Sequence, residues 1–261
     1  MRIQIPSHVE YIIGKLNQNG YEAFAVGGCV RDTLLGRTPG DWDITTSARP
    51  EQVKALFRRT IDTGIQHGTV TVMLERTGYE VTTYRIDGEY EDGRHPRQVE
   101  FTSDLLEDLK RRDFTINAMA YSHETGIVDA FGGMEDLEKR VIRCVGEPME
   151  RFEEDALRIL RAIRFSAQLD FFHRGKKPEK RLPGFAPNLA KVSRERVQME
   201  LTKLLCSDHP EQIRQVYETE ISGMCQKNFL PSLGEGGDFP CSAQKKKYVR
   251  WAAISPVRMS D

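Results

Sequence analysis

The sequence lacks long hydrophobic runs and paired cysteines. No run of about eighteen uncharged apolar residues occurs, which is the length that a membrane-spanning helix needs. The N-terminus, Met1–Pro6, also lacks the apolar segment of a signal peptide. The cysteines are scattered without a CxxC pair, so neither a zinc site nor a disulfide framework is predicted. These absences favour a cytoplasmic protein with free thiols and no membrane partner.

The sequence also lacks an excess of charge of one sign. Lysine and arginine total 38 against 39 aspartate and glutamate residues, which gives a net charge of -1. Bulk electrostatics therefore do not favour nucleic-acid binding, and any RNA-binding surface must be local. Basic residues are concentrated at Lys110–Arg112 and Arg158–Arg164. With 261 residues and 39% hydrophobic content, the chain can bury a core in one or two compact units.

The spacing of apolar residues predicts an α+β protein. Apolar residues at helical spacing alternate with short Val-, Thr- and Tyr-rich stretches, so we expect a mixed sheet with flanking helices, followed by a helical neck domain. Helices are expected at residues 9–16, 29–35, 50–57, 110–121, 150–168 and 192–205. Strands are expected at 21–26, 41–44, 68–74, 79–86 and 98–101, with a hairpin turn at Thr77-Gly78. The expected domains are a head at 1–140, a neck at 141–217 and an atypical, poorly ordered tail at 218–261.

Two acids, Asp41 and Asp43, are the first candidates for a metal site. They lie two residues apart on a predicted strand, so both carboxylates are expected on the same side. Two carboxylates that share divalent ions suit two-metal phosphoryl transfer, because hard oxygen ligands hold Mg²⁺. Taken alone, this DxD motif is better explained as a turn whose acids face water.

The residues before these acids favour the functional interpretation. Gly27 and Gly28 form a predicted strand-to-helix turn, and Arg31 follows one helical turn later. Glycine lets the backbone approach a phosphate, unpaired N–H groups at a helix start bind it, and arginine adds charge-assisted hydrogen bonds. Such a turn shortly before a DxD motif has the spacing of a polymerase β-like nucleotidyltransferase site.

Further polar residues are candidates for the same site. Glu80, in a predicted strand, is either a third carboxylate beside the DxD motif or an exposed strand residue. In Lys110–Asn117, Arg112 is a candidate for holding a triphosphate, and Asp113 or Asn117 for binding a ribose hydroxyl. The start of a solvated helix would have a similar sequence.

The segment Glu154–Arg164 is a candidate for base recognition. Asp155 and Arg158 are three residues apart on a predicted helix, and Arg161 and Arg164 continue a positive stripe. A carboxylate only accepts and a guanidinium only donates, which matches the Watson–Crick edges of cytosine and adenine and clashes with those of uracil and guanine. A mismatch would leave polar groups unpaired, at about 1–3 kcal/mol each. An ordinary intrahelical salt bridge is the alternative.

Six segments resemble, in order, the successive motifs of the class II CCA-adding enzymes, within the bacterial tRNA nucleotidyltransferase and poly(A) polymerase family. These segments are Gly27–Arg31, Asp41–Asp43, Arg111–Asp113, Asp129–Gly133, Glu154–Arg158 and Ser193–Arg196. The resemblance covers about residues 20–205. It implies a polymerase β-like nucleotidyltransferase head that uses Mg²⁺, CTP and ATP to add C, C and A to the 3′ end of tRNA without a nucleic-acid template.

The resemblance also implies a role for each motif. The implied assignments are metal binding by Asp41 and Asp43, triphosphate contacts from Gly28, Arg31 and Arg112, ribose recognition near Asp113, base selection by Asp155 and Arg158, and a nucleotide pocket lined by Arg161 and Arg164. Asp129–Gly133 would be a hinge, and the helix from Ser193 would brace the base-reading helix. The loop at 87–94 resembles the element that accompanies the switch from C to A addition.

Two stretches depart from the family pattern. Residues 171–186 do not match the helical connection expected there, and after about Tyr217 the resemblance ends. We therefore expect a chain that ends before the body and tail domains that grip tRNA. Two alternatives stay open: a bacterial poly(A) polymerase with a nearly identical head, and a non-catalytic remnant that binds nucleotide or RNA. The sequence does not indicate an oligomeric state.

Overall fold

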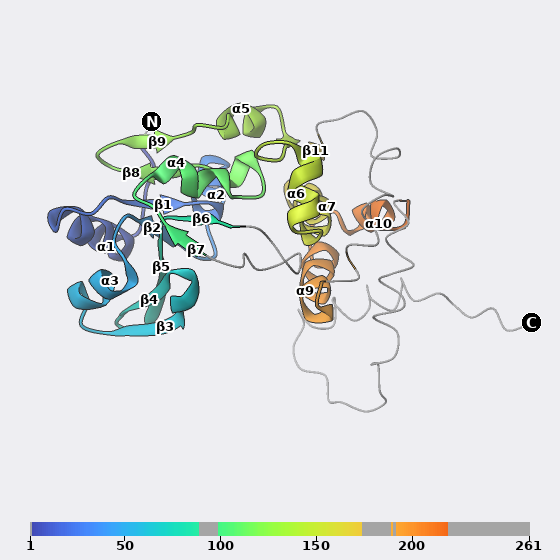
Figure 1. The fold of residues 1–261 in the computed structure, drawn as a ribbon. Coiled ribbons are helices and arrows are strands. Elements are labelled where there is room, and N and C mark those ends of the chain that lie inside the picture. The colour runs from blue at the N-terminus through green and yellow to red at the C-terminus, as the bar shows by residue number, and fades with distance from the viewer. Residues whose placement is uncertain (1, 89–98, 174–188, 190–191, 219–261) are drawn as a thin grey trace, which may run out of the picture. The chain divides into compact units, whose positions relative to one another are not determined.

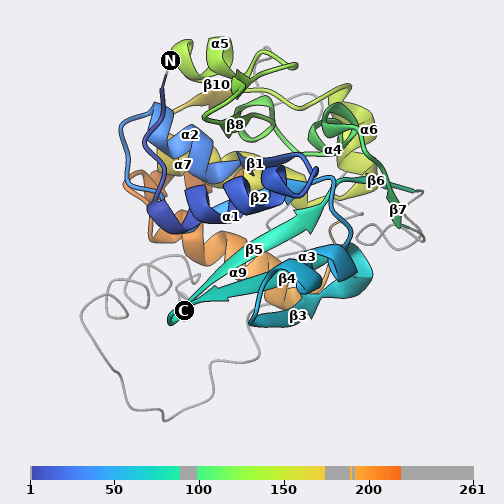
Figure 2. The ribbon, with the colours of Figure 1, turned by 90° about the vertical axis from the view of Figure 1, so that its left-hand side faces the viewer.

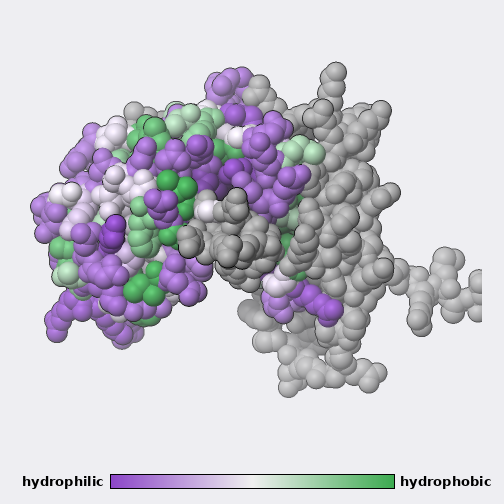
Figure 3. All heavy atoms as spheres, viewed as in Figure 1, coloured by the Kyte–Doolittle hydropathy of each residue, from purple (hydrophilic) through white to green (hydrophobic). Residues whose placement is uncertain are grey.

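The computed structural model describes residues 2–88, 99–173, 189 and 192–218 (Figure 1). Contacts divide the chain into two compact units. The first consists of Met1–Glu91 and His95–Arg151, and the second of Asp92–Arg94 and Phe152–Asp261. In the view of Figure 3 the described surface is mostly hydrophilic. None of the helices in these described ranges is long and apolar enough to cross a membrane.

The first unit is built around one seven-stranded mixed sheet, which confirms the predicted α+β class. Its strand order is β3-β4-β5-β2-β1-β8-β9. The strands are β1 (Ala23–Val26), β2 (Asp43–Thr46), β3 (Thr60–Gly64), β4 (Thr69–Leu74), β5 (Thr77–Thr83), β8 (Ala120–Ser122) and β9 (Gly126–Val128). Strands β2 and β5 run parallel, and the other neighbouring pairs run antiparallel. A separate two-stranded ribbon pairs β6 (Arg85–Asp87) with β7 (Val99–Phe101).

Helices cover this sheet through their apolar faces. They are α1 (Ser7–Gln18), α2 (Gly28–Leu34), α3 (Pro50–Leu56) and α4 (Leu105–Lys110), whereas α5 (Gly133–Glu138) packs against the segments 115–117 and 141–142. Helix α1 buries Val9, Ile12, Ile13 and Leu16, which recur at helical spacing, and it packs on β1 and β2 (Figure 2). Leu105 and Leu109 of α4 join a buried cluster with Phe24, Val26, Tyr84 and Ala120. Because Phe24 and Val26 alternate along β1, α4 covers the sheet face to which both point.

The second unit is helical in its described part. Its main helices are α7 (Leu157–Leu169) and α9 (Arg194–Leu205), followed by the 3₁₀ turn η5 (Pro210–Ile213) and α10 (Arg214–Glu218). Of the remaining short elements, the first unit contains η1 (Ile65–His67), η2 (Thr115–Asn117) and β10 (Val141–Ile142), the second contains β11 (Phe172–His173), and α6 (Pro148–Glu154) crosses the division. The core of the second unit is formed by Ala156, Leu157, Ile159, Leu160, Ile163, Ala167, Leu189, Val192, Val197, Leu201, Leu204, Leu205 and Val216.

The helix predicted at 150–168 is wrong as a single helix. Helix α6 ends at Glu154 and α7 begins at Leu157. Asp155 lies between them, and its Oδ1 accepts a hydrogen bond from the Leu157 backbone N–H at 3.0 Å. An aspartate that satisfies an otherwise unpaired N–H at a helix start favours a break there. Asp155 and Arg158 therefore do not lie on one continuous helix.

The helix predicted at 110–121 is also wrong. Helix α4 ends at Lys110, and the chain continues through η2 into β8. The Thr115 N–H bonds to the Arg143 carbonyl at 2.9 Å, and the Val145 N–H bonds to the Asp113 carbonyl at 3.1 Å. These long-range backbone bonds replace the helical ones, which periodicity along the sequence cannot reveal.

The predicted hairpin forms, but its turn lies earlier than expected. Leu74 pairs with Thr77, so the connection is Glu75-Arg76 and not Thr77-Gly78. Glu75 adopts a positive φ of 54°, a conformation that two-residue hairpin turns require. The strand predicted at 79–86 is divided, because β5 ends at Thr83 and Arg85 begins the ribbon with β7.

Candidate active site

The two predicted metal-binding acids lie at the start of β2. Asp43 is the first residue of the strand, whereas Asp41 precedes the strand and is exposed. Asp41 and Asp43 were expected on the same side because side chains alternate along a strand, and this argument applies only to Asp43. Asp43 pairs with Val26 and lies on the same strand face as Thr45, two residues later. Thr45 bonds to a side chain of α4, so Asp43 points to the face that α4 covers.

Glu80 lies next to Asp43 on this face. Strands β2 and β5 run parallel, and Thr45 lies opposite Thr82. Asp43 and Glu80 are each two residues earlier on their strands, so their side chains lie beside each other on the same face. Burial, followed by the negative charges of Asp41 and Glu80, raises the pKa of Asp43 to about 6, and Arg112 opposes this rise. Three carboxylates thus share one region of negative potential. Within the described ranges, however, no group of three or more His, Cys, Asp or Glu side chains is arranged to hold a metal ion.

The glycine turn brings two arginines together. Gly27 has a φ of 81° and precedes α2, so the left-handed backbone there favours glycine. A Cβ on Gly27 would lie 3.0 Å from Nη1 of Arg112, and a Cβ on Gly28 would lie 3.6 Å from Nη2 of Arg31. The turn between β1 and α2 therefore has a guanidinium group beside each glycine.

Arg31 is connected to the two other predicted nucleotide-binding residues. Its Nη1 donates to Asn117 Oδ1 at 2.5 Å, and Asn117 Nδ2 donates to Asp113 Oδ1 at 3.1 Å. Arg31 also pairs with Asp32 at 2.9 Å. The structure thus gathers Gly28, Arg31, Arg112, Asp113 and Asn117, which the sequence proposed separately. Arg31, Asp113 and Asn117 are buried, so this network is held in a fixed arrangement.

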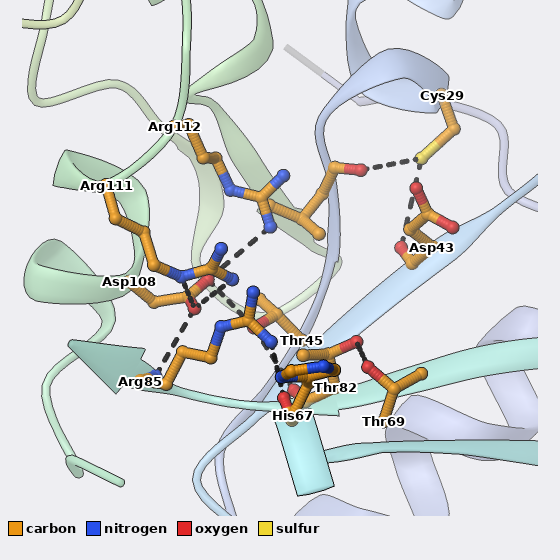
Figure 4. A network of polar contacts seen from close by, with 11 residues as sticks. Cys29, Asp43, Thr45, His67, Thr69, Thr82, Arg85, Asp108, Arg111 and Arg112 are labelled. Atoms are coloured by element: carbon orange, nitrogen blue, oxygen red, sulfur yellow. Dashed lines mark hydrogen bonds and ion pairs between the residues drawn. The ribbon is translucent and has the colours of Figure 1, made fainter. Parts of the chain in front are cut away.

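Asp108 is a residue of this region that sequence reasoning missed. Its side chain is fully buried in α4 and lies among Arg111, Arg112 and Thr45 (Figure 4). Burial opposes its ionisation, but the Arg111 and Arg112 guanidinium groups hold the pKa of Asp108 below its usual value. The signal was present, since an acid three and four residues before two arginines on a helix predicts ion pairs.

The predicted base-reading residues lie in the second unit and are held by other side chains. Asp155 Oδ2 accepts from Arg196 Nη2 at 2.8 Å, and Arg158 Nη1 donates to Glu154 Oε2 at 2.5 Å. Ser193 precedes α9 as predicted, although its side chain forms no capping hydrogen bond.

Glu200 holds the two following arginines. Its Oε2 accepts from Arg164 Nε at 2.5 Å, and its Oε1 lies 3.6 Å from Arg161 Nη1. Arg164 also lies 3.8 Å from the centre of the Phe165 ring. Sequence reasoning missed Glu200. The available signal was a glutamate on the apolar stripe of α9, between Val197 and Leu204.

The predicted hinge, Asp129–Gly133, forms a close-packed turn. The Asp129 carboxylate accepts from the backbone N–H groups of Gly133 at 2.7 Å and Met134 at 2.9 Å, at the start of α5. A Cβ on Gly133 would lie 2.4 Å from the Thr115 carbonyl oxygen, so only glycine fits. Most of the predicted loop at 87–94, most of the stretch 171–186, and residues 219–261 lie outside the described residues.

Family models match both units. The model of the poly(A) polymerase head domain matches residues 23–143, and a model described as a probable RNA- and SrmB-binding site of polymerase A matches residues 176–223. A CCA-adding enzyme of Leuconostoc mesenteroides is 54% identical over 201 residues, which cover 77% of this chain and 50% of that protein. One of Ligilactobacillus salivarius is 43% identical over 262 residues and covers 96% of this chain and 63% of its own length. The chain thus spans about half to two thirds of the length of these curated relatives.

A solved structure shows the same fold. The Bacillus stearothermophilus CCA-adding enzyme in complex with CTP superposes with a TM-score of 0.75 at 44% identity, over 85% of this chain and 55% of that one. The Thermotoga maritima CCA-adding enzyme complexed with tRNA gives a TM-score of 0.68 at 25% identity, over 90% of this chain and 58% of that one. With its mixed sheet, glycine turn and neighbouring acids, this chain belongs to the poly(A) polymerase and CCA-adding enzyme family of nucleotidyltransferases.

Proposed function

We propose that this chain carries the nucleotidyltransferase site of a CCA-adding enzyme. It would add C, C and A to the 3′ end of tRNA from CTP and ATP, without a nucleic-acid template, and would act in the cytoplasm. The observation that carries the proposal is the gathering of Asp41, Asp43 and Glu80 beside Arg112 and the Gly27-Gly28 turn. Relatives solved with CTP and with tRNA support the choice of substrates.

Mg²⁺ is the proposed cofactor, and the carboxylate chemistry at the start of β2 suits it, although the described residues do not form a group of three acids already arranged around a metal ion. The carboxylates of Asp41 and Asp43 supply hard oxygen ligands, and Glu80 is proposed as a third. Burial, followed by the negative charges of Asp41 and Glu80, raises the pKa of Asp43 to about 6, and a bound cation would offset both effects. When bound there, the metal would promote ionisation of the attacking hydroxyl and neutralise charge that develops on the phosphate.

The proposed reaction is an in-line displacement at phosphorus. The 3′ hydroxyl oxygen of the RNA forms a bond to the α-phosphorus of CTP or ATP, and the bond from that phosphorus to the bridging oxygen breaks. The hydroxyl proton leaves to solvent, and pyrophosphate carries away the bonding electron pair. The protein contributes by holding the reacting groups in line in a fixed electrostatic environment.

The arginines would bind the phosphates of the nucleotide. Arg112 has guanidinium donors beside Gly27, and its Nε has no hydrogen-bond partner among the described residues. Arg31 is fixed beside Gly28, where a backbone without a Cβ admits a phosphate closely. Asn117, which bonds to Arg31, and Asp113, which bonds to Asn117, would bind the ribose.

Base selection is assigned to Asp155 and Arg158, with Arg161 and Arg164 lining the pocket. Each oxygen of the Asp155 carboxylate accepts one hydrogen bond in the structure, from Leu157 or Arg196. Each oxygen has a second lone pair, so a carboxylate oriented in this way retains capacity to accept from the amino group of cytosine or adenine.

Incorporation of single nucleotides tests the proposal. The 261-residue chain would be incubated with Mg²⁺ and tRNA that lacks its terminal CCA, with CTP, ATP, UTP and GTP supplied singly and together. The expected products are two added C residues with CTP and a complete CCA end with CTP plus ATP. Long A tails with ATP alone would identify a poly(A) polymerase. Absence of any incorporation would overturn the proposal and favour a binding remnant.

A further inference from the structure

Asp108 is a buried acid that the proposed chemistry does not use. Its Oδ1 accepts from Arg111 Nε at 3.0 Å and Nη2 at 2.7 Å. Its Oδ2 accepts from the Thr45 hydroxyl at 3.1 Å and forms an ion pair with Arg112 Nη2 at 3.4 Å. The side chain has no solvent exposure, so its charge is retained only because these donors compensate for lost hydration.

These contacts join Asp108 to the strand that carries the acids. Thr45 lies two residues after Asp43 on the same face of β2. The Thr45 hydroxyl also lies 3.3 Å from the Thr82 carbonyl of β5, the strand that carries Glu80. The backbone N–H of Arg85 reaches Asp108 Oδ1 at 3.4 Å. Helix α4 is thereby fastened to the sheet beside Asp43 and Glu80, as Figure 4 shows for Asp108, Thr45 and Thr82.

The same carboxylate restrains Arg112. One terminal nitrogen of this guanidinium points to Asp108, and the other lies beside Gly27. Arg112 also lies close enough to Asp43 to influence its charge. Without Asp108, Arg112 would be attracted to Asp43, whose charge it already influences, and an ion pair there would withdraw the guanidinium from the glycine turn.

We infer that Asp108 is a positioning residue, which keeps Arg112 at the Gly27-Gly28 turn and away from the Asp41–Asp43 carboxylates. The inference rests on the proposed function, because it assigns Arg112 to the phosphates of an incoming nucleotide. Asp108 has no solvent exposure, so it would not itself contact nucleotide or metal. Asp108 acts by fixing the direction in which the guanidinium group of Arg112 donates its hydrogen bonds.

Binding of inorganic tripolyphosphate tests the inference without catalysis. Titration calorimetry of the full chain would compare wild type with Asp108→Asn, which keeps the shape of the side chain and removes its charge. The expected dissociation constant rises about tenfold, the size of one charge-assisted hydrogen bond. In incorporation assays the KM for CTP should rise by a similar factor while kcat changes less. Glu107→Gln is the control and should leave binding unchanged, because Glu107 lies on the same helix, is partly exposed and pairs with Lys110 at 3.6 Å.

A double-mutant cycle separates positioning from a merely structural role. If Asp108 acts through Arg112, Asp108→Asn will cost no further affinity in an Arg112→Gln background. An equal loss in both backgrounds, or an unchanged dissociation constant in Asp108→Asn, would overturn the inference. Should Asp108→Asn fail to fold, Thr45→Val is decisive, because it removes one donor to Asp108 and leaves every charge in place. It should weaken tripolyphosphate binding in the same direction, and unchanged binding would overturn the inference.

The two proposals fail in different ways. Wild-type protein that binds tripolyphosphate but incorporates no nucleotide would sink the proposed function and leave the role of Asp108 standing. Normal incorporation together with wild-type affinity in Asp108→Asn would sink the role of Asp108 alone. Wild-type protein that binds no tripolyphosphate would contradict both.

Discussion

Each of the two compact units contains a buried carboxylate that binds two arginines. In the first unit Asp108 binds Arg111 at 2.7 Å and Arg112 at 3.4 Å. In the second unit Glu200 binds Arg164 at 2.5 Å and lies 3.6 Å from Arg161. The two clusters have similar chemistry but different origins.

The difference lies in where the arginines come from. The two arginines that bind Asp108 follow it in the sequence by three and four residues, so these ion pairs form within α4 and the residues that directly follow it. Those of Glu200 come from α7, so they form only when α7 packs on α9. The ion pairs of the first cluster are therefore local in sequence, although Thr45 of β2 also bonds to Asp108, whereas those of the second form only through the packing of two helices. We therefore expect loss of Asp108 to alter ligand binding in addition to stability, and loss of Glu200 to alter the stability of the packed helices α7 and α9.

The largest expected effect is that of Glu200→Gln. It removes the charge that compensates Arg164, whose side chain is buried, and breaking one partner of a buried pair costs about 3–5 kcal/mol. Hydrogen exchange in a urea series should show α7 and α9 losing protection while the strands of the first unit keep theirs. Glu195→Gln, exposed on the same helix, is the control. Equal loss of protection in both units would contradict the division drawn here.

Base selection should respond to Asp155→Asn. The amide places a donor where the carboxylate only accepted, so discrimination against UTP should fall by about 10–100-fold, in line with 1–3 kcal/mol per unpaired group. The measurement is the ratio of kcat/KM for CTP and UTP on tRNA lacking CCA. Arg196→Met, which releases Asp155 Oδ2 without changing the acid, should lower the ratio less. An unchanged ratio in Asp155→Asn would refute the selection rule.

A smaller effect on stability is expected from a change of pH, and its direction differs between Asp43 and Asp108, two acids of the first unit. Because folding raises the pKa of Asp43 from 3.8 to about 6, the folded state binds its proton more tightly than the unfolded state. Stability of the metal-free protein should therefore fall as pH rises from about 4 to 7, by on the order of 1 kcal/mol after screening by solvent. Asp108, whose pKa is lowered, contributes in the opposite direction and loses its contribution only in acid.

Thermal unfolding in EDTA would detect the Asp43 contribution. The Tm of Asp43→Asn should exceed that of wild type at pH 8, and the difference should shrink at pH 5. A wild-type Tm higher than that of the variant at pH 8 would contradict the cost of a charged Asp43 that is buried and lies near Asp41 and Glu80.

The smallest effect is expected from an exposed ion pair. Lys54 and Asp62 lie 2.8 Å apart with partly exposed side chains. Solvent screens such pairs, so Lys54→Gln should change the free energy of unfolding by less than about 0.5 kcal/mol. Chemical denaturation would measure it. A loss comparable with that of Glu200→Gln would show that burial is not what makes the loss of Glu200 costly.

The sequence predicted the elements whose signals are local. Helical spacing located α1, and β-rich stretches located β4 and β5 as a hairpin. The acids and the glycine turn were identified because each motif is contiguous. What failed depended on partners distant in the chain: Thr115 bonds to Arg143 instead of continuing a helix.

The same limit explains the site residues that were missed. The sequence indicates the ion pairs of Asp108 with Arg111 and Arg112, but not its bond to Thr45, 63 positions earlier, which joins it to the site. Glu200 likewise gains its meaning from Arg164, 36 positions earlier. Asp155 was identified as a candidate, but its position between two helices depends on a capping bond that periodicity does not encode.

The central claim is that Asp41 and Asp43 act as one unit in nucleotidyl transfer. Single-turnover incorporation of CMP into tRNA lacking CCA would be measured for wild type, Asp41→Asn, Asp43→Asn and the double variant. Residues that act as a unit are not additive, so each single variant should lose about 10³-fold or more and the double variant little further. Either single variant with a rate near that of wild type, or losses that multiply in the double variant, would contradict the account.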